Sequence, residues 1–165
     1  MTSSRLTRVK MVVGGIGVAF ALLAGIRVAH AATYAVNGAT CNPVQGSASL
    51  VTYDSYGIQN TSSGSTASVV CPIPTVQGAT FNSPFQINVY DRSSAGNVSC
   101  SLFTQNTSGT PTFIQTIQSS GTPGYTQISF SSFGSTAYGG VLECSIPYNT
   151  GSGNSYITSI LYTHP

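Results

Sequence analysis

The sequence predicts an all-β domain, an antiparallel β-sandwich of eight or nine short strands that is either jelly-roll-like or immunoglobulin-like. The apolar positions beyond residue 31 are mostly Ile, Val, Phe and Tyr, in short runs that alternate with polar residues. Clusters of Gly, Pro, Ser, Thr and Asn separate these runs, as turns do. No long run has the period of an amphipathic helix. These observations define the class and leave both topologies open.

The candidate strands follow one another at short intervals. There are ten candidate runs for the eight or nine strands, and the first three are the weakest. In chain order they cover residues 34–36, 49–53, 56–60, 67–71, 85–90, 98–102, 112–117, 125–130, 141–146 and 156–162. The run 85–90 has a clear alternation, in which Phe85, Ile87 and Val89 share one face. The run 98–102 repeats this pattern after a turn at 91–97, so these two strands are predicted to form a hairpin. Turn clusters at 119–124, 139–140 and 149–154 separate the later strands.

The first 31 residues have the pattern of a secretory signal peptide. Arg5, Arg8 and Lys10 precede an apolar run at 11–26, and the small residues Ala29 and Ala31 mark a cleavage site. The apolar run is shorter than the roughly 20 residues that a membrane-spanning helix needs. We therefore expect a signal peptide at 1–31, a single domain at 32–165 with no membrane span, and export by the general secretory route to the periplasm or outside the cell.

Cleavage would leave very few charges. Arg92 remains against Asp54, Asp91 and Glu143, so the precursor's formal net charge of +2 becomes −2. One basic side chain cannot neutralise several phosphates, which argues against nucleic acid and against anionic lipid as partners. Arg92 is expected to pair with one of the three acids.

The four cysteines are expected to form disulfides, because an exported chain with an even number of cysteines usually does. Their wide spacing does not resemble the close pairs of a zinc site. Cys100 and Cys144 each share the apolar face of their own strand, which favours one bridge between them. That leaves Cys41 to pair with Cys71, although the other two pairings remain open.

Catalytic chemistry has few candidate residues. His164 is the only histidine beyond residue 31 and lies next to the end of the chain, and no G-x-S-x-G motif is present. A pair among Asp54, Asp91 and Glu143 could in principle hydrolyse a glycoside. Asp91 is expected to bind its own turn, and Glu143 is expected to face water. We predict a protein that is not an enzyme, with no cofactor and no metal, and calcium at Asp91 is only a weak alternative.

Sugar binding is a second hypothesis, because all nine tyrosines lie beyond residue 31 and aromatic faces stack on sugars. The candidate contacts lie in or near predicted loops: Tyr53, Tyr56, Tyr138 and Tyr148. Against this reading, the chain has no Trp, and Tyr is also an ordinary strand residue.

Several cysteine-bearing runs carry a resemblance to a known group of proteins. They are C-P-I-P at 71–74, I-N-V-Y-D at 87–91, V-S-C-S-L at 98–102, L-E-C-S-I-P at 142–147 and S-Y-I-T-S-I-L-Y at 155–162. These runs resemble an uncharacterised family of small secreted proteobacterial proteins. The resemblance implies export, disulfides and a β-sandwich, and no activity. Gly153 and Tyr162 echo the final strand of fimbrial pilins only loosely.

Taken together, these patterns favour a secreted or envelope protein that acts through surface interactions, with a glycan or a protein as partner. A carbohydrate-binding module and a pilin-like assembly subunit are the alternatives.

Overall fold

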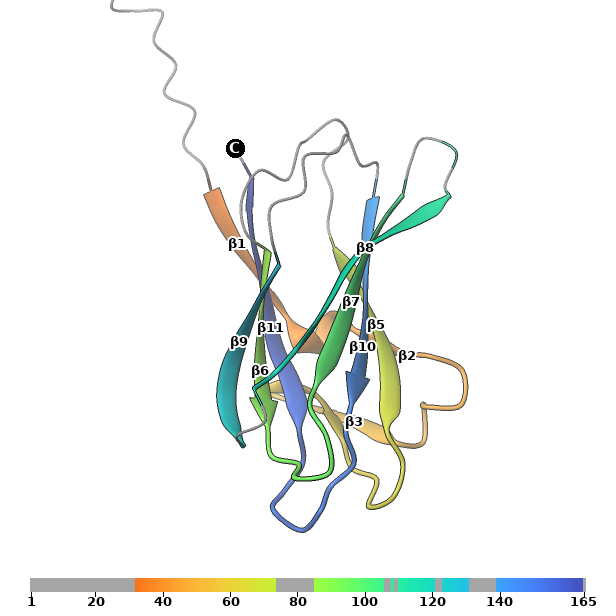
Figure 1. The fold of residues 1–165 in the computed structure, drawn as a ribbon, viewed down its shortest axis with the longest axis vertical. Helices are drawn as coiled ribbons and strands as arrows, with labels where there is room; N and C mark the ends of the chain where they lie inside the picture. Colours follow the sequence, from red (N-terminus) through yellow and green to blue (C-terminus); the bar gives the residue numbers. More distant parts are fainter. Residues whose placement is uncertain are drawn as a thin grey trace, which may run out of the picture. The chain divides into compact units, whose positions relative to one another are not determined.

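Two antiparallel sheets form the domain in the computed structural model, which describes residues 32–73, 85–105, 108, 110–120, 123–130 and 139–164 (Figure 1). Sheet A has the order β3 (Val51–Asp54), β4 (Gly57–Asn60), β11 (Tyr156–His164), β6 (Phe85–Asp91), β9 (Gly124–Phe130), and β1 (Ala32–Asn37) also pairs with β11. Sheet B has the order β2 (Asn42–Pro43), β5 (Ala67–Ile73), β10 (Gly139–Ile146), β7 (Ser99–Gln105), β8 (Pro111–Gln118). The predicted signal peptide lies outside the described residues and stays a prediction.

The strand order is that of a jelly roll. From β4 onward, the strands form two four-stranded sheets with the orders β4-β11-β6-β9 and β5-β10-β7-β8. The predicted fold class is therefore confirmed, and the jelly-roll form is the one that the protein adopts. The described residues contain 11 strands rather than eight or nine. One of these, the two-residue β2, is too short to leave an alternating pattern in the sequence.

The predicted hairpin between residues 85–90 and 98–102 is wrong. β6 belongs to sheet A and β7 to sheet B, so the segment between them crosses from one sheet to the other. The physical reason is Asp91, whose side chain points inward and is 1% exposed. Its carboxylate accepts a hydrogen bond from the backbone N–H of Val98, and this bond turns the chain over the end of the sandwich.

Alternation along the strands builds the core between the sheets. Phe85, Ile87 and Val89 of β6 are buried, and the ring of Phe85 packs on Phe130 of β9 with 5.8 Å between centroids. The other fully buried large side chains come from both sheets: Ile58, Val69, Leu102, Ile128, Leu142, Ile146, Ile157 and Ile160. Burial of these groups supplies the main driving force for folding.

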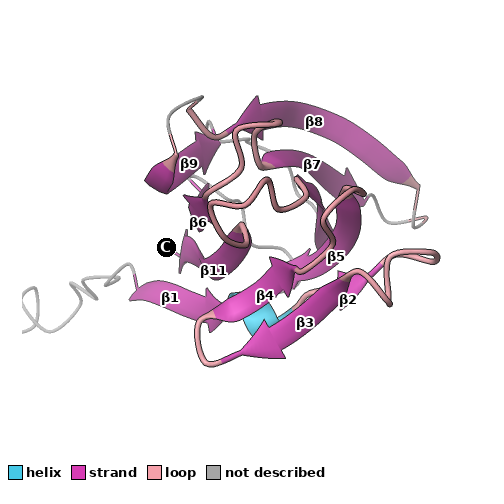
Figure 2. Cartoon of the chain, turned by 90° about the horizontal axis from the view of Figure 1, so that it is seen from below, coloured by secondary structure: helices cyan, strands magenta, loops and turns pink. Residues whose placement is uncertain are grey.

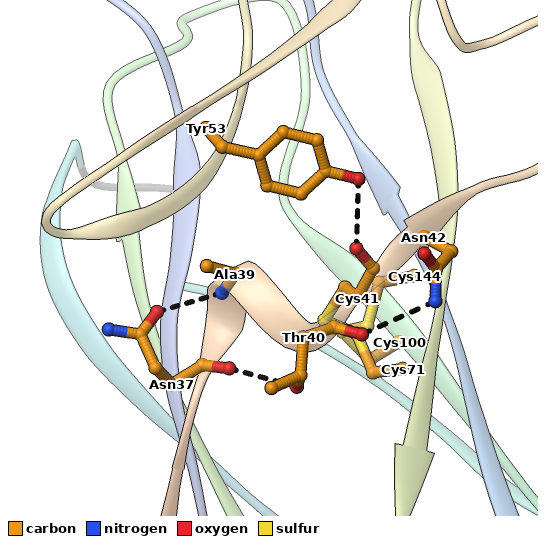
Figure 3. Close-up of a disulfide and its surroundings, with 9 residues drawn as sticks. All are labelled: Asn37, Ala39, Thr40, Cys41, Asn42, Tyr53, Cys71, Cys100 and Cys144. Atoms are coloured by element: carbon orange, nitrogen blue, oxygen red, sulfur yellow. Dashed lines mark hydrogen bonds between the residues drawn. A yellow bond between two sulfur atoms is a disulfide. The ribbon is translucent and has the colours of Figure 1, made fainter.

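Both disulfides lie on the inner side of sheet B (Figure 3). Cys100 and Cys144 face each other across β7 and β10, with Cα atoms 4.1 Å apart. Cys41 immediately precedes β2 and is bonded to Cys71 of β5, with Cα atoms 4.0 Å apart. All four residues are fully buried. The pairing that the strand pattern favoured is the one in the structure.

A short 3-10 helix carries the chain from sheet A to sheet B. This helix, η1 (Gly38–Thr40), joins β1 to the Cys41–Cys71 bridge and is the cyan element in Figure 2. A Cβ atom at Gly38 would lie 2.0 Å from the carbonyl oxygen of Ile157, so only glycine allows η1 to approach β11 this closely. No helix among the described residues is long and apolar enough to cross a membrane.

Tyr162 lies where β1 and β11 pair. It is 7% exposed, and its ring stacks on that of Tyr34, its partner across the strands, with 5.4 Å between centroids. Burial raises the pKa of Tyr162 above its ordinary value of 10.0, and the neighbouring Tyr34 raises it further. The phenolate is therefore disfavoured in the folded state.

We expect the free energy of unfolding to fall as the pH rises above about 10, in part because of Tyr162. The pKa of Tyr162 is higher in the folded protein than in the unfolded chain, so the unfolded chain loses this proton first as the pH rises. The stabilisation is therefore fully present below the unfolded-state pKa and is lost as the pH rises through the folded-state pKa. Urea denaturation across this range should show a shallower decline for Tyr162→Phe than for the wild type. Tyr125→Phe, which removes a hydroxyl at an exposed position, is the control for the substitution itself. Equal slopes for the wild type and Tyr162→Phe would contradict this assignment.

Candidate functional site

The outer face of sheet A carries a row of tyrosines. Tyr156 of β11 lies opposite Tyr90 of β6, and Tyr90 lies opposite Tyr125 of β9. Tyr56, in the turn between β3 and β4, packs beside Tyr156 with 6.5 Å between ring centroids. The residues on either side of Tyr90 and of Tyr156 along the chain are buried, so alternation turns these tyrosines to the outer face. We call these four residues the tyrosine row.

The rings of the tyrosine row differ in what they present to solvent. Tyr90 and Tyr156 stack with 5.3 Å between centroids and 17° between planes, so each covers one face of the other. Tyr56 stacks on Tyr156 at 27°. The two ends of the row are the most exposed, at 67% for Tyr56 and 61% for Tyr125. The row thus offers exposed rings at its ends and a partly covered stacked pair in its middle.

A row of polar side chains runs parallel to the tyrosines on the same face. Ser159, Asn88 and Gln127 are register partners across β11, β6 and β9. Nδ2 of Asn88 donates to Oγ of Ser159 at 2.9 Å, and Nε2 of Gln127 donates to Oδ1 of Asn88 at 3.1 Å. These bonds fix the orientation of the two amides. Gln127 is exposed and can form further hydrogen bonds, whereas Asn88 is only 8% exposed and supports Gln127 from beneath. We call these three residues the amide row.

Side-chain hydrogen bonds fix the end of the tyrosine row at Tyr56. The carboxylate of Asp54 accepts from the backbone N–H of Tyr56 at 2.7 Å and from Nε2 of Gln59 at 3.1 Å. Oε1 of Gln59 accepts from Nδ2 of Asn154 at 3.0 Å, and Oδ1 of Asn154 accepts from Nδ2 of Asn149 at 3.0 Å. The β3–β4 turn and the 149–154 loop are therefore held together beside the row.

Arg92 lies on the tyrosine row rather than beside an acid, so the expected ion pair is wrong for the described residues. Its guanidinium carbon is 4.9 Å from the ring centroid of Tyr90, within the range of a cation–π interaction. Its backbone N–H donates to Oγ of Ser155 at 2.9 Å, which ties β6 to the start of β11.

Asp91 positions this end of the face from the inner side. Its carboxylate accepts hydrogen bonds from the backbone N–H groups of Ser93 and Val98, both at 3.1 Å. It also accepts from the hydroxyls of Ser119 and Ser155. The Asx bond to Ser93 was expected from the sequence, whereas the burial and the contacts with two distant serines were not. These bonds hold the ends of β6, β8 and β11 together beneath the tyrosine row.

The tyrosines that the sequence singled out do not form one site. Tyr56 belongs to the tyrosine row, but Tyr53 is on another side, where its hydroxyl donates to the carbonyl oxygen of Cys41 at 3.0 Å (Figure 3). Tyr148 is partly buried in the segment that follows β10. Tyr138 lies outside the described residues.

Three members of the row were not identified from the sequence. Tyr90, Tyr125 and Tyr156 lie within strands rather than in loops. The available signal was that Tyr90 alternates with buried aliphatic residues and therefore points outward. Which strands would be neighbours could not be known without the topology.

The three acids lie in separate environments. Asp54 is exposed at the end of β3, Asp91 is buried at the end of β6, and Glu143 is exposed on the outer face of sheet B, as expected. His164 ends β11, where it pairs with Ala32 of β1. Among the described residues no group of three His, Cys, Asp or Glu side chains could hold a metal ion. Both oxygens of Asp91 already accept protein hydrogen bonds, which argues against the calcium alternative.

A second surface feature lies on the outer face of sheet B. Phe103, Pro111, Val141 and Glu143 line an open groove of about 260 Å³. Phe113, 55% exposed, packs edge-on against Phe103 with 5.7 Å between centroids. This groove is mostly apolar and has one carboxylate, whereas the face of sheet A combines aromatic rings with ordered amides.

The domain thus belongs to the class of jelly-roll β-sandwiches with an aromatic and amide-bearing sheet face. No protein-family model matches the chain, and no curated protein sequence matches it. Among solved structures, the fold is similar to a xylan-binding module CBM15, with a TM-score of 0.52 and 16% identity, covering 82% of this chain and 97% of that one.

Two other solved structures match the chain with TM-scores below 0.5. A mutant of Xylanase10C from Cellvibrio japonicus in complex with xylopentaose has a TM-score of 0.45 and 15% identity, covering 78% of this chain and 28% of that one. The enzymatically active domain of tailspike protein 4 of bacteriophage CBA120 has a TM-score of 0.44 and 9% identity, covering 82% of this chain and 19% of that one. At these identities the likeness concerns the fold alone.

Proposed function

We propose that this domain is a non-enzymatic carbohydrate-binding module that binds a polysaccharide along the tyrosine row. The observation that carries the proposal is the register of sheet A, which brings Tyr156, Tyr90 and Tyr125 into one line beside the parallel amide row of one serine and two amides. A sugar ring has an apolar face of C–H groups and a rim of hydroxyls. Tyrosine rings complement the face, and amides complement the hydroxyls.

The scarcity of charge supports the same conclusion. Sugar hydroxyls are neutral groups that both donate and accept hydrogen bonds, and the exposed amide of Gln127 does the same. This amide is already oriented by the bonds within the amide row, so little side-chain entropy remains to be lost on binding. The two disulfides fit an oxidising environment such as the periplasm or the extracellular space, where polysaccharides are accessible.

The fold shared with a xylan-binding module makes xylan the first polysaccharide to test. The groove on sheet B is a weaker candidate for the site, because Phe103, Pro111 and Val141 offer no side-chain hydrogen-bonding group to a hydroxyl. Phe113 beside it nevertheless gives a matched control, because its exposed fraction is close to that of Tyr125.

We expect Tyr125→Ala and Tyr56→Ala each to weaken binding to xylan about tenfold, which corresponds to roughly 1.4 kcal/mol for the loss of one aromatic stacking contact. Binding can be measured by isothermal titration calorimetry or affinity electrophoresis, after a glycan array has identified other ligands. Phe113→Ala should leave the affinity within a factor of two.

This experiment distinguishes a binding site on the tyrosine row from one at the groove on sheet B. Loss of binding in Phe113→Ala, with full binding in the two tyrosine variants, would place the site on sheet B. If the wild type binds none of the polysaccharides on the array, carbohydrate binding itself is the wrong function.

A further inference from the structure

The side chain of Arg92 is held in place without the help of an acid. It is exposed, and its guanidinium lies over the ring of Tyr90. On another side it lies against Gly153, where a Cβ atom would come within 2.7 Å of one guanidinium nitrogen and 3.0 Å of Cδ. Gly153 has a φ of +110°, so glycine is favoured there on two grounds. The guanidinium is therefore oriented before any ligand arrives.

The guanidinium forms no ion pair within the part of the chain that the structure describes. Asp91, next in the sequence, points to the interior and accepts four hydrogen bonds there. Asp54 accepts bonds from its own turn and lies on β3, three strand positions across sheet A from β6, which is roughly 14 Å or more. Glu143 lies on the other sheet. An oriented cation on the sugar-binding face thus remains available to an anion.

We propose that the tyrosine row binds an acidic polysaccharide and that Arg92 pairs with the carboxylate of a uronic acid residue on that chain. This inference rests on the proposed carbohydrate binding and names the class of sugar. A guanidinium is a planar fork of donors that fits a planar carboxylate with two parallel hydrogen bonds. The guanidinium stacks on Tyr90 and donates no hydrogen bond to a described residue, so its N–H groups are available to make them.

The test compares two forms of one polysaccharide. Glucuronoxylan carries uronate groups on a neutral backbone, and chemical reduction of its carboxyl groups gives a neutral chain of the same length and branching. We expect the wild-type protein to bind the native form about fivefold more tightly than the reduced form at low ionic strength. Added salt should reduce this preference, because the pair is exposed to solvent.

Two substitutions at Arg92 isolate its contribution. Arg92→Gln should bind both forms with the affinity that the wild type has for the reduced form. Arg92→Lys keeps the charge but loses the planar fork, so it should retain only part of the preference. Arg92 is exposed, so neither substitution should alter the fold. The circular dichroism spectra should be unchanged, and the melting temperature should fall by no more than about 5 °C through the loss of the contact with Tyr90.

The outcomes separate this inference from the function on which it rests. Equal binding of both forms by the wild type, or a preference that persists in Arg92→Gln, would overturn the role of Arg92 and leave carbohydrate binding intact. If neither form is bound, and no glycan on the array is bound either, both proposals fail together.

Discussion

Replacing Asp91 by alanine is expected to lower the free energy of unfolding by about 4 kcal/mol, because buried donors lose a charged acceptor. The carboxylate is 1% exposed and accepts from two backbone N–H groups and two hydroxyls. The N–H groups of Ser93 and Val98 also donate to Oγ of Ser155 and of Ser119, at 3.2 and 3.0 Å, so in the variant each keeps a neutral acceptor and loses the charged one. A domain with a stability of roughly 5–15 kcal/mol loses a large share of it through this one change.

Asp54→Ala is the matched control. Asp54 also accepts backbone and side-chain hydrogen bonds around a turn, but it is exposed, so water can replace the lost acceptor. Its loss should cost less than about 1 kcal/mol. Urea denaturation of the two variants measures the difference. Similar midpoints for Asp91→Ala and Asp54→Ala would show that the buried network contributes little to stability.

Removing both disulfides should leave the domain mostly unfolded at 37 °C. Each bridge closes a loop of 30 or 44 residues, and each is worth about 4 kcal/mol on the chain-entropy model. The single pair variants Cys41→Ala with Cys71→Ala, and Cys100→Ala with Cys144→Ala, should fold with melting temperatures lowered by roughly 12 °C.

The two single pair variants also test which part of the domain each disulfide stabilises. Cys100 and Cys144 join strands that are already paired along a ladder of seven register positions. Cys41 and Cys71 instead clamp a crossover beside the two-residue strand β2. Removing the Cys41–Cys71 bridge should therefore increase hydrogen exchange mainly near β1, η1 and β2. Removing the Cys100–Cys144 bridge should increase it more evenly along the domain. If the variant that lacks both disulfides melts within a few degrees of the wild type, the disulfides do not supply the stability assigned to them here.

The alternating pattern of the strands was sufficient to predict the fold class but not the topology. A period of two shows which residues of 85–90 point inward, and those residues are indeed buried. The same period does not show which strand of the sheet pairs with residues 85–90. The next strand, 98–102, has the same pattern and a short connection, so a hairpin was the natural prediction. The deciding feature was Asp91, a polar residue in an inward position that binds the crossing segment from inside the sandwich.

The same limit applies to the tyrosine row. Tyr56 was identified because it lies in a turn, and turns are where binding residues are usually sought. Tyr90, Tyr125 and Tyr156 come from strands that are far apart in the sequence and adjacent in sheet A. Their common line depends on the register of two strand pairs, which hydrogen bonds and core packing set together.

The position of β11 determines when this chain can fold. β11 is the last strand in the sequence, yet in sheet A it separates β6 and β9 from β1, β3 and β4 (Figure 1). A chain that emerges from a ribosome or a translocation pore with its N-terminus first therefore holds three unconnected parts of this sheet, β1, β3 with β4, and β6 with β9, until residues 156–164 follow. A chain truncated before β11 would present the unpaired edges of β4 and β6 to other chains, which is the usual route to aggregation of β-proteins.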